Sequence, residues 1–215
     1  MNVIIAGSTG MIGKLVLANC LNSDKVTEVR SLVRKPSGQQ HPKLTEIAVE
    51  NFEDYSAHEN LFKDISTAFF CLGVYTGQVH DDLFKKITVD YAAEFAKTLE
   101  KNSPMATICL LSGAGADMTE KSKTSFARYK GMAENKIKNM NLRFCSFRPG
   151  YIYPVEPREE PNFSYKMMRS LYPVILVLGK KYSIKSTELA NAMFNVGING
   201  ADKQILENKD ILSYI

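Results

Sequence analysis

The chain has 215 residues and a mass of 24.1 kDa, and 45% of its residues are hydrophobic, which indicates one compact domain. Its net charge is only +4, and no basic stripe with interleaved aromatic residues occurs, so we expect no nucleic-acid partner. The longest apolar run, Val174–Leu178, is too short to cross a bilayer, so we expect no membrane partner.

The first predicted strand, Asn2–Ala6, runs directly into a glycine-rich turn and then a helix. Glycines have no Cβ, so the backbone can turn sharply and approach a pyrophosphate, while the amides at the start of the helix face the anion. The residues predicted to bind a dinucleotide in this way are Gly7, Ser8, Thr9, Gly10, Met11, Ile12 and Gly13. The alternative is a strand–turn–helix with fortuitous glycines.

Strand-like and helix-like patterns of apolar residues alternate along the rest of the chain. The predicted strands are Asn2–Ala6, Val26–Val33, Leu44–Val49, Thr67–Leu72, Ala106–Leu111 and Leu142–Phe147. The predicted helices are Met11–Leu21, Asp81–Glu100, Phe126–Met140, Ser186–Val196 and a shorter one at Phe163–Tyr172. Short strands that are apolar on both faces predict a parallel sheet covered on both sides. We therefore expect an α/β fold with a doubly wound, Rossmann-type sheet in the order 3-2-1-4-5-6, and a ligand over the carboxyl ends of its strands.

The second predicted strand ends in two cations, Arg34 and Lys35. A site specific for NAD usually has Asp or Glu at this position to bind the ribose 2′-hydroxyl. A guanidinium can instead pair with a 2′-phosphate, so we predict NADP, with NAD as the alternative cofactor. The bland interpretation is a solvated basic strand end.

The ends of the third and fourth predicted strands allow two interpretations each. Asn51 and Phe52 could contact the adenine edge of a cofactor, or could form only a turn. Leu72 and Gly73 could let the loop pass beneath the adenine-ribose half of a cofactor, or could be core and turn.

The fifth predicted strand ends at Ser112, whose hydroxyl could hydrogen-bond a substrate carbonyl or merely a nearby backbone group. Reduction of a carbonyl also needs a proton donor, and a Tyr four residues before a Lys shares a helix face with it and can serve. Lys130 is present, but Phe126 stands four residues before it and has no hydroxyl. Tyr129 has one, but it projects about a quarter turn away from Lys130. The segment would also suit a purely structural helix.

Cysteines and histidines indicate neither disulfides nor a metal site. The four cysteines, Cys20, Cys71, Cys109 and Cys145, lie singly in apolar segments, so we expect buried reduced thiols and a cytoplasmic location. The histidines have no ligand-like spacing. Because Val3–Ala6 must belong to the core, we expect no signal peptide before the first strand.

In combination, these segments resemble the atypical short-chain dehydrogenases/reductases, and within them the Tat-interacting-protein family of NADP-binding, oxidoreductase-like proteins. The segments that carry the resemblance are residues 6–13, 70–73, 89–91, 110–117, 129–134, 147–150 and 206–209.

The resemblance implies a dinucleotide-binding domain at residues 1–150 and a substrate-covering region at 151–215, packed on the same domain. Gly7–Gly13 would surround the pyrophosphate, and Arg34 would face the adenosine phosphate. Lys130 would hold the nicotinamide ribose, and Ser112 would lie beside the substrate oxygen. Pro149, Gly150 and Ile152 would border the nicotinamide carboxamide, and Tyr153–Lys181 would cover the substrate.

The chain departs from the family pattern at Phe126, where the family has Tyr. One hypothesis is an NADP-dependent oxidoreductase for a small carbonyl or nucleotide-sugar-like substrate, in which Tyr129, Ser112 or a substrate-bound water donates the proton. The other is a dinucleotide-binding regulator that acts through a protein partner. The helices Asp81–Glu100 and Phe126–Met140 could form a homodimer seam, or could face solvent.

Overall fold

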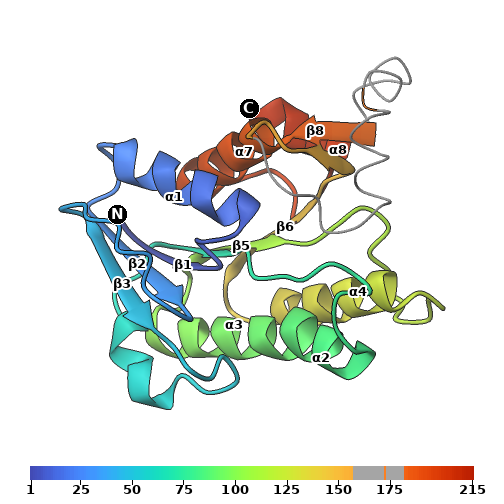
Figure 1. Ribbon diagram of the computed structural model, residues 1–215, viewed down its shortest axis with the longest axis horizontal. Helices are drawn as coiled ribbons and strands as arrows, with labels where there is room; N and C mark the ends of the chain where they lie inside the picture. The colour runs from blue at the N-terminus through green and yellow to red at the C-terminus, as the bar shows by residue number, and fades with distance from the viewer. Residues whose placement is uncertain (157–171, 173–181) are drawn as a thin grey trace.

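The structure, a computed structural model, describes residues 1–156, 172 and 182–215. Within these residues the main sheet has seven parallel strands in the order β3-β2-β1-β4-β5-β6-β9 (Figure 1). Their bounds are β1 Asn2–Ala6, β2 Glu28–Val33, β3 Leu44–Ala48, β4 Thr67–Phe70, β5 Thr107–Leu111, β6 Arg143–Arg148 and β9 Ile205–Glu207. A small second sheet pairs β7 (Tyr151–Tyr153) with β8 (Ser183–Lys185), also in parallel.

Helices cover both faces of the main sheet (Figure 1). On one face lie α1 (Met11–Asn22) and α7 (Ser186–Asn199), and on the other lie α3 (Tyr91–Asn102) and α4 (Ser125–Lys138). The remaining helical segments are η1 (Ser56–Phe62), α2 (Asp81–Lys85), η2 (Lys86–Asp90), α8 (Asn208–Ile211) and η4 (Leu212–Tyr214). Segment η2 is a π-helical turn between α2 and α3, so the predicted helix that begins at Asp81 is continuous but not α-helical throughout.

Strand β1 shows why these sequences form a sheet that is buried on both faces. Val3 and Ile5 belong to the hydrophobic core beneath α1 and α7, whereas Ile4 and Ala6 belong to the core beneath α3 and α4. All four side chains are fully buried. Successive side chains of a strand point to opposite faces, so an uninterrupted apolar run supplies two cores at once.

The observed order of the first six strands is the predicted 3-2-1-4-5-6, and the predicted fold class is confirmed. Strand β9 extends the sheet beyond β6 and was not expected, nor was the β7–β8 pair. Strand β9 brings part of the region after residue 150 into the same sheet as the region before it. The predicted helix Phe163–Tyr172 and cover segment Tyr153–Lys181 lie, apart from residues 153–156 and 172, outside the described residues.

Candidate functional site

The turn between β1 and α1 is packed so closely that two of its glycines cannot be replaced without strain. Gly7 has φ +87°, and a Cβ on it would lie 2.6 Å from the Leu72 backbone nitrogen. A Cβ on Gly13 would lie 2.1 Å from the Gly7 carbonyl oxygen. By contrast, a Cβ on Gly10 would lie no closer than 3.3 Å to that same oxygen, which already accepts a hydrogen bond from the Gly10 N–H at 3.1 Å. Gly7 and Gly13 are therefore required by the fold, whereas Gly10 keeps the outer side of the turn open.

Helix α1 presents an uncapped N-terminus at this turn. Its N-cap residue is Gly10, which has no side chain to accept a hydrogen bond from the first helical amides, and its first turn contains no acidic residue. Uncapped amides and the positive end of the helix dipole together favour an anion.

The other predicted loop residues differ in what their side chains do. The Ser8 hydroxyl is buried and lies 2.6 Å from the hydroxyl of Ser31 in β2, so it fastens the turn to the neighbouring strand. Ile12 is part of the hydrophobic core, whereas Thr9 is exposed. The partnership with Ser31 was missed because a serine in an otherwise apolar strand carries no sequence signal of its own.

The second strand ends at two exposed cations. Arg34 and Lys35 directly follow β2, which lies next to β1 in the sheet, and both side chains are exposed. Neither forms an ion pair with any acidic residue in the part of the chain that the structure describes. Their charges are therefore available to an anionic ligand at this edge of the site.

Asn51 and Phe52 differ in the side-chain surface that they offer a ligand, since Asn51 is exposed and Phe52 is buried. The Asn51 side-chain oxygen accepts a hydrogen bond from the Glu53 N–H at 3.0 Å, as in a local turn. The Phe52 ring is buried and stacks on Tyr91, with ring centroids 5.8 Å apart. Only their backbone and the outer atoms of Asn51 remain for a cofactor.

Leu72 and Gly73 follow β4, on the side of β1 away from β2. The backbone here passes directly beside Gly7, as the short contact to the Leu72 nitrogen shows, and the Cys71 N–H donates to the Ala6 carbonyl at 2.8 Å. A Cβ on Gly73 would meet nothing within 4 Å, so this residue borders open space.

Ser112, Lys130 and Phe126 meet at the carboxyl end of β5. The Ser112 side chain is buried, and its hydroxyl has no hydrogen-bond partner among the described residues. The Lys130 ammonium donates to the carbonyl of Leu111, the residue before Ser112, at 2.9 Å. The ring of Phe126 lies against Gly113, since a Cβ on that glycine would be 2.5 Å from the ring's Cζ atom. A buried hydroxyl without a partner is costly, which suggests that a polar ligand atom completes this arrangement.

Burial changes the acid–base properties of this group of residues. Desolvation lowers the pKa of Lys130 to about 8, although the Glu134 carboxylate acts in the opposite direction. Desolvation also raises the pKa of the neighbouring Cys71 thiol to about 12, so that thiol remains neutral. All four cysteines are free thiols, as predicted, and three of them are buried; Cys71 is only half-buried, so the expected burial is wrong for this residue.

Tyr129 is turned away from this group. Its hydroxyl donates a hydrogen bond to Asp81 in the first turn of α2 at 2.5 Å, and its ring packs on Phe84 with a centroid distance of 5.8 Å. The guanidinium of Arg128 lies 5.0 Å from the centroid of the Tyr129 ring. The structure thus brings Lys130 and Ser112 together but directs the Tyr129 hydroxyl to another helix.

A buried ion pair between Glu134 and Arg148 lies next to Lys130. The Glu134 side chain is fully buried, one helical turn after Lys130, and accepts hydrogen bonds from Ser146 at 2.7 Å and from Arg148 Nε at 3.0 Å. Arg148 also donates to Glu207 in β9 at 3.0 Å. These hydrogen bonds and charges raise the pKa of Arg148 above its ordinary value, with the Glu134 hydrogen bond the largest cause.

The loop after β6 is held by the C-terminal part of the chain. The Gly150 N–H donates to the Asn208 side-chain oxygen at 2.8 Å, and the Asn208 amide donates to the Ser183 carbonyl at 3.1 Å. The Pro149 carbonyl accepts from the Ala114 N–H at 2.9 Å, while Ile152 lies in β7. The sequence interpretation missed the supporting roles of Glu134, Arg148 and Asn208, because their partners lie far from them in the chain or in buried strands.

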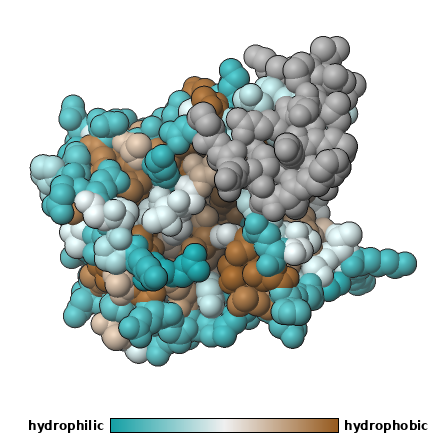
Figure 2. Space-filling view, in the orientation of Figure 1, coloured by the Kyte–Doolittle hydropathy of each residue, from teal (hydrophilic) through white to brown (hydrophobic). Residues whose placement is uncertain are grey.

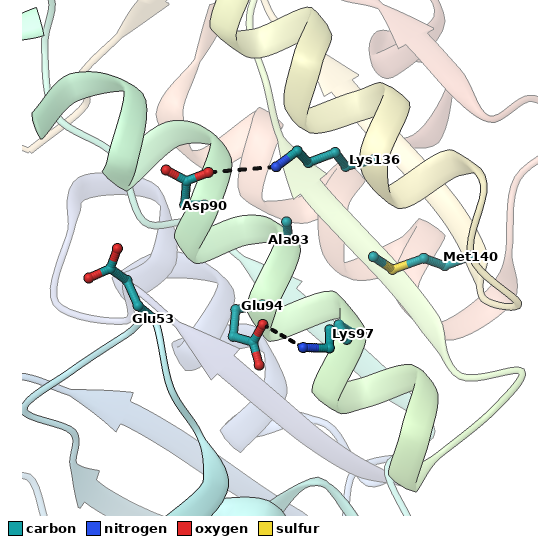
Figure 3. Close-up of a pocket in the computed structure, with 7 residues that line it drawn as sticks. All are labelled: Glu53, Asp90, Ala93, Glu94, Lys97, Lys136 and Met140. Atoms are coloured by element: carbon teal, nitrogen blue, oxygen red, sulfur yellow. Dashed lines mark hydrogen bonds and ion pairs between the residues drawn. The ribbon is translucent and has the colours of Figure 1, made fainter. Parts of the chain in front are cut away.

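A separate surface pocket of about 450 Å³ lies between α3, α4 and the loop after β3 (Figure 3). Its charged side chains neutralise one another: Lys136 pairs with Asp90 at 3.6 Å and Lys97 with Glu94 at 3.2 Å, as the dashed lines in Figure 3 show. Glu53 pairs with Lys86 at 2.6 Å. The pocket therefore offers a ligand no unpaired charge among its lining residues.

Figure 2 shows one face of the molecule, on which hydrophobic side chains form small areas separated by hydrophilic ones, rather than one broad patch.

Among the described residues, no helix is long and apolar enough to span a bilayer, and no three potential metal ligands gather in one place.

Comparisons with known proteins find similarity over most of the chain. A family model described as NAD(P)H-binding matches residues 7–195. The protein fmp52, mitochondrial, of Emericella nidulans is 25% identical over all of this chain and 94% of its own length. Gre2 from Candida albicans, solved in complex with NADPH, superposes with a TM-score of 0.70 at 14% identity, covering 96% of this chain and 77% of Gre2. A UDP-glucose 4-epimerase from Thermotoga maritima, solved with UDP-glucose, gives a TM-score of 0.65 at 14% identity, covering 91% and 73% of the two chains.

Proposed function

Since this chain belongs to the NAD(P)H-binding family, we propose that it is an NADP(H)-dependent oxidoreductase for a small carbonyl compound or a nucleotide-sugar-like substrate. The observation that carries the proposal is the turn between β1 and α1. Gly7 and Gly13 stand where a Cβ would collide with the backbone, and the N-terminus of α1 beside them has no side-chain cap. Such a turn meets a ligand with backbone amides, which is what a pyrophosphate requires.

The preference for NADP is supported by the two exposed cations after β2. Arg34 and Lys35 have no acidic partner in the described part of the chain, so a 2′-phosphate would gain their charge without breaking an ion pair. Gre2 was solved with NADPH, although other proteins of similar fold were solved with NAD.

Each of the remaining site residues would contact one part of a bound dinucleotide. Gly7–Gly13 would hold the pyrophosphate, Arg34 the adenosine phosphate and Lys130 the nicotinamide ribose. Leu72, Gly73 and the backbone at Asn51 and Phe52 would border the adenosine half, with Pro149, Gly150 and Ile152 at the nicotinamide end. A bound nicotinamide would supply a hydride. The Ser112 hydroxyl is buried and has no partner among residues 1–156, 172 and 182–215, and it would donate a hydrogen bond to the substrate oxygen.

Cofactor binding can be tested by fluorescence titration of the purified chain with NADPH and NADH, before any substrate is known. We expect NADPH to bind more tightly than NADH. Gly10→Ala is the informative variant, because its methyl group would occupy the open side of the turn without a severe clash in the fold. It should weaken NADPH binding at least tenfold. Lys138→Ala, at an exposed position at the end of α4, is the control and should bind NADPH as the wild type does.

Turnover can be tested with NADPH and a panel of aldehydes, ketones and nucleotide-sugar-like carbonyl compounds. The expected result is oxidation of NADPH by at least one of them, at a rate that Ser112→Ala reduces. No NADPH binding by wild type would refute the proposal as a whole. Binding without turnover across the panel would favour the second candidate function.

That second candidate is a dinucleotide-binding regulator that acts through a protein partner. It is favoured by the lack of an available aromatic proton donor: Phe126 has no hydroxyl, and the Tyr129 hydroxyl donates to Asp81. Pull-downs with and without NADPH should then recover different partners, and identical partners in both would count against it.

A cytoplasmic location and a homodimer through α3 and α4 remain predictions, and the fungal relative is described as mitochondrial.

A further inference from the structure

We propose that Lys130 itself gives the proton to the substrate's carbonyl oxygen, while Ser112 orients that oxygen. This inference rests on the proposed oxidoreductase function. It assigns to the lysine amine the proton transfer for which the site has no aromatic hydroxyl.

The first argument is that both neighbouring aromatic residues are unsuited to donate. Phe126 has its ring against Gly113, next to Ser112, but carries no exchangeable proton. Tyr129 has a hydroxyl, but it donates to the Asp81 carboxylate at 2.5 Å. Transfer of the tyrosine proton to a substrate would break this charge-assisted hydrogen bond and would leave the phenolate facing a carboxylate.

The second argument is the position of the Lys130 amine. It donates to the Leu111 carbonyl at 2.9 Å, which places it at the residue before Ser112, at the carboxyl end of β5. An ammonium has three N–H donors, and no second hydrogen bond to Lys130 occurs within the described residues. The Ser112 hydroxyl also has no hydrogen-bond partner in the described part of the chain. The Lys130 ammonium and the Ser112 hydroxyl, both at the carboxyl end of β5, are therefore available to donate to a substrate oxygen.

The third argument is electrostatic. The charged and titratable groups that face Lys130 are the Glu134 carboxylate on its own helix and the Cys71 thiol after β4. Glu134 is already paired with Arg148, and Cys71 stays neutral because burial raises its pKa to about 12. Desolvation therefore dominates and lowers the pKa of Lys130 to about 8. With this pKa the amine can both release and take up a proton near neutral pH.

The proton transfer balances without any further reactant. As the carbonyl carbon gains the hydride that a reduced nicotinamide supplies, the oxygen takes a proton from the Lys130 ammonium. An O–H bond forms and an N–H bond breaks, with its electron pair remaining on nitrogen. The neutral amine then recovers a proton from solvent. Ser112 donates a hydrogen bond throughout and keeps its own proton.

Competitive labelling of the wild-type chain with acetic anhydride tests the acid–base behaviour of Lys130. Acetylation of each lysine is measured by mass spectrometry across pH 6 to 11, and Lys136, on the solvent side of the same helix, is the internal control. Access affects the rate of acetylation but not its midpoint in pH. We expect the midpoint of Lys130 about two pH units below the 10.5 that is ordinary for a lysine. A midpoint for Lys130 at the ordinary value would overturn the proposal, even if NADPH binds as proposed above.

A second experiment follows the reaction with a carbonyl substrate found in the panel. Lys130→Arg keeps the positive charge but cannot release a proton near neutral pH, so kcat should fall at least about 100-fold. The affinity for NADPH, measured in parallel, should change much less. Adding Phe126→Tyr to this variant should restore part of the lost kcat by supplying a new donor. Wild-type kcat in Lys130→Arg would overturn the proposal, whereas absent NADPH binding would refute the proposed function instead.

Discussion

Arg34 is the residue on which the choice between the two nicotinamide cofactors is expected to depend. Its side chain is exposed at the end of β2, with no acidic partner in the described residues. Arg34→Glu should reduce the affinity for NADPH at least tenfold and should leave NADH binding equal or stronger, because a carboxylate repels a 2′-phosphate and accepts hydrogen bonds from a 2′-hydroxyl. Fluorescence titration with both cofactors measures the change.

Lys35→Glu is the matched control for this prediction, since it reverses a neighbouring charge. A smaller effect from Lys35→Glu would assign the phosphate contact to Arg34. If Arg34→Glu left the ratio of the two affinities unchanged, the cations would have no role in selecting the cofactor.

Lys130 should also make the stability of the fold depend on pH. Its pKa is lowered to about 8 in the folded chain from an ordinary 10.5, so between these values the unfolded chain binds more protons. The free energy of unfolding of wild type should therefore rise relative to that of Lys130→Met as pH increases. At about 1.36 kcal/mol per pKa unit, the expected relative gain from pH 7 to pH 9.5 is about 2 kcal/mol.

Urea unfolding of both proteins at the two pH values measures this difference. A constant difference would mean that Lys130 titrates alike in the folded and unfolded chains. That result would also contradict its assignment as a group that exchanges protons near neutral pH.

Residues of the site were predictable where their spacing carried the signal. Gly7 and Gly13 follow a strand at regular intervals, and the structure gives a steric reason for both. Ser31 and Asn208 could not be found in this way. Ser31 bonds to Ser8 across 23 residues and Asn208 bonds to Gly150 across 58, so each acquires its role only when the chain has folded.

At the scale of elements, the strongest prediction concerns the contact between α2 and α4. Hydrogen bonds from Ser125 and Tyr129 lower the pKa of Asp81 below its ordinary 3.8. A carboxyl group with a lowered pKa stabilises the fold above its unfolded pKa and loses that effect as pH falls through its folded value. Asp81→Asn should therefore lower the thermal unfolding temperature by a few degrees at pH 7, and the difference should shrink as the pH falls below the ordinary pKa of 3.8 and through the lower folded one.

Tyr129→Phe should produce a similar loss at pH 7, and the double variant should be little worse than either single one, because each removes the same charge-assisted hydrogen bond: one its donor, the other the charge of its acceptor. Asp82→Asn, one residue along α2, is the control. Additive losses in the double variant would show that the two residues act independently, so that Tyr129 would be free to act elsewhere.

The elements themselves were largely predictable from the period of their apolar residues. Strand β1 and its neighbours have uninterrupted apolar runs that fill both cores, and the right-handed crossovers expected between parallel strands predict the order of the first six. Strands β7, β8 and β9 have three residues each, too few for any period to be read. They form because long-range partners, such as β6 for β9, supply the missing hydrogen bonds.

At the scale of the whole molecule, the C-terminal segment supplies the edge strand of the main sheet and holds the loop after β6. Strand β9 pairs with β6, and Arg148 of β6 bonds to both Glu134 and Glu207. The support of Lys130 on α4 and the edge of the sheet therefore belong to one connected set of interactions. Asn208, directly after β9, extends this set to the loop at Gly150.

Asn208→Ala tests that connection. The side chain is buried, and its loss would leave the Gly150 N–H and the Ser183 carbonyl without the partners they have now. At about 1 to 3 kcal/mol for each unsatisfied buried group, urea unfolding should show a loss of about 2 to 6 kcal/mol. NADPH affinity should fall as well, because Gly150 borders the proposed nicotinamide end of the site. Lys209→Ala, at the exposed neighbouring position, should change neither quantity. A destabilised Asn208→Ala variant that bound NADPH with wild-type affinity would separate the loop after β6 from the cofactor site and confine the C-terminal segment to a role in stability.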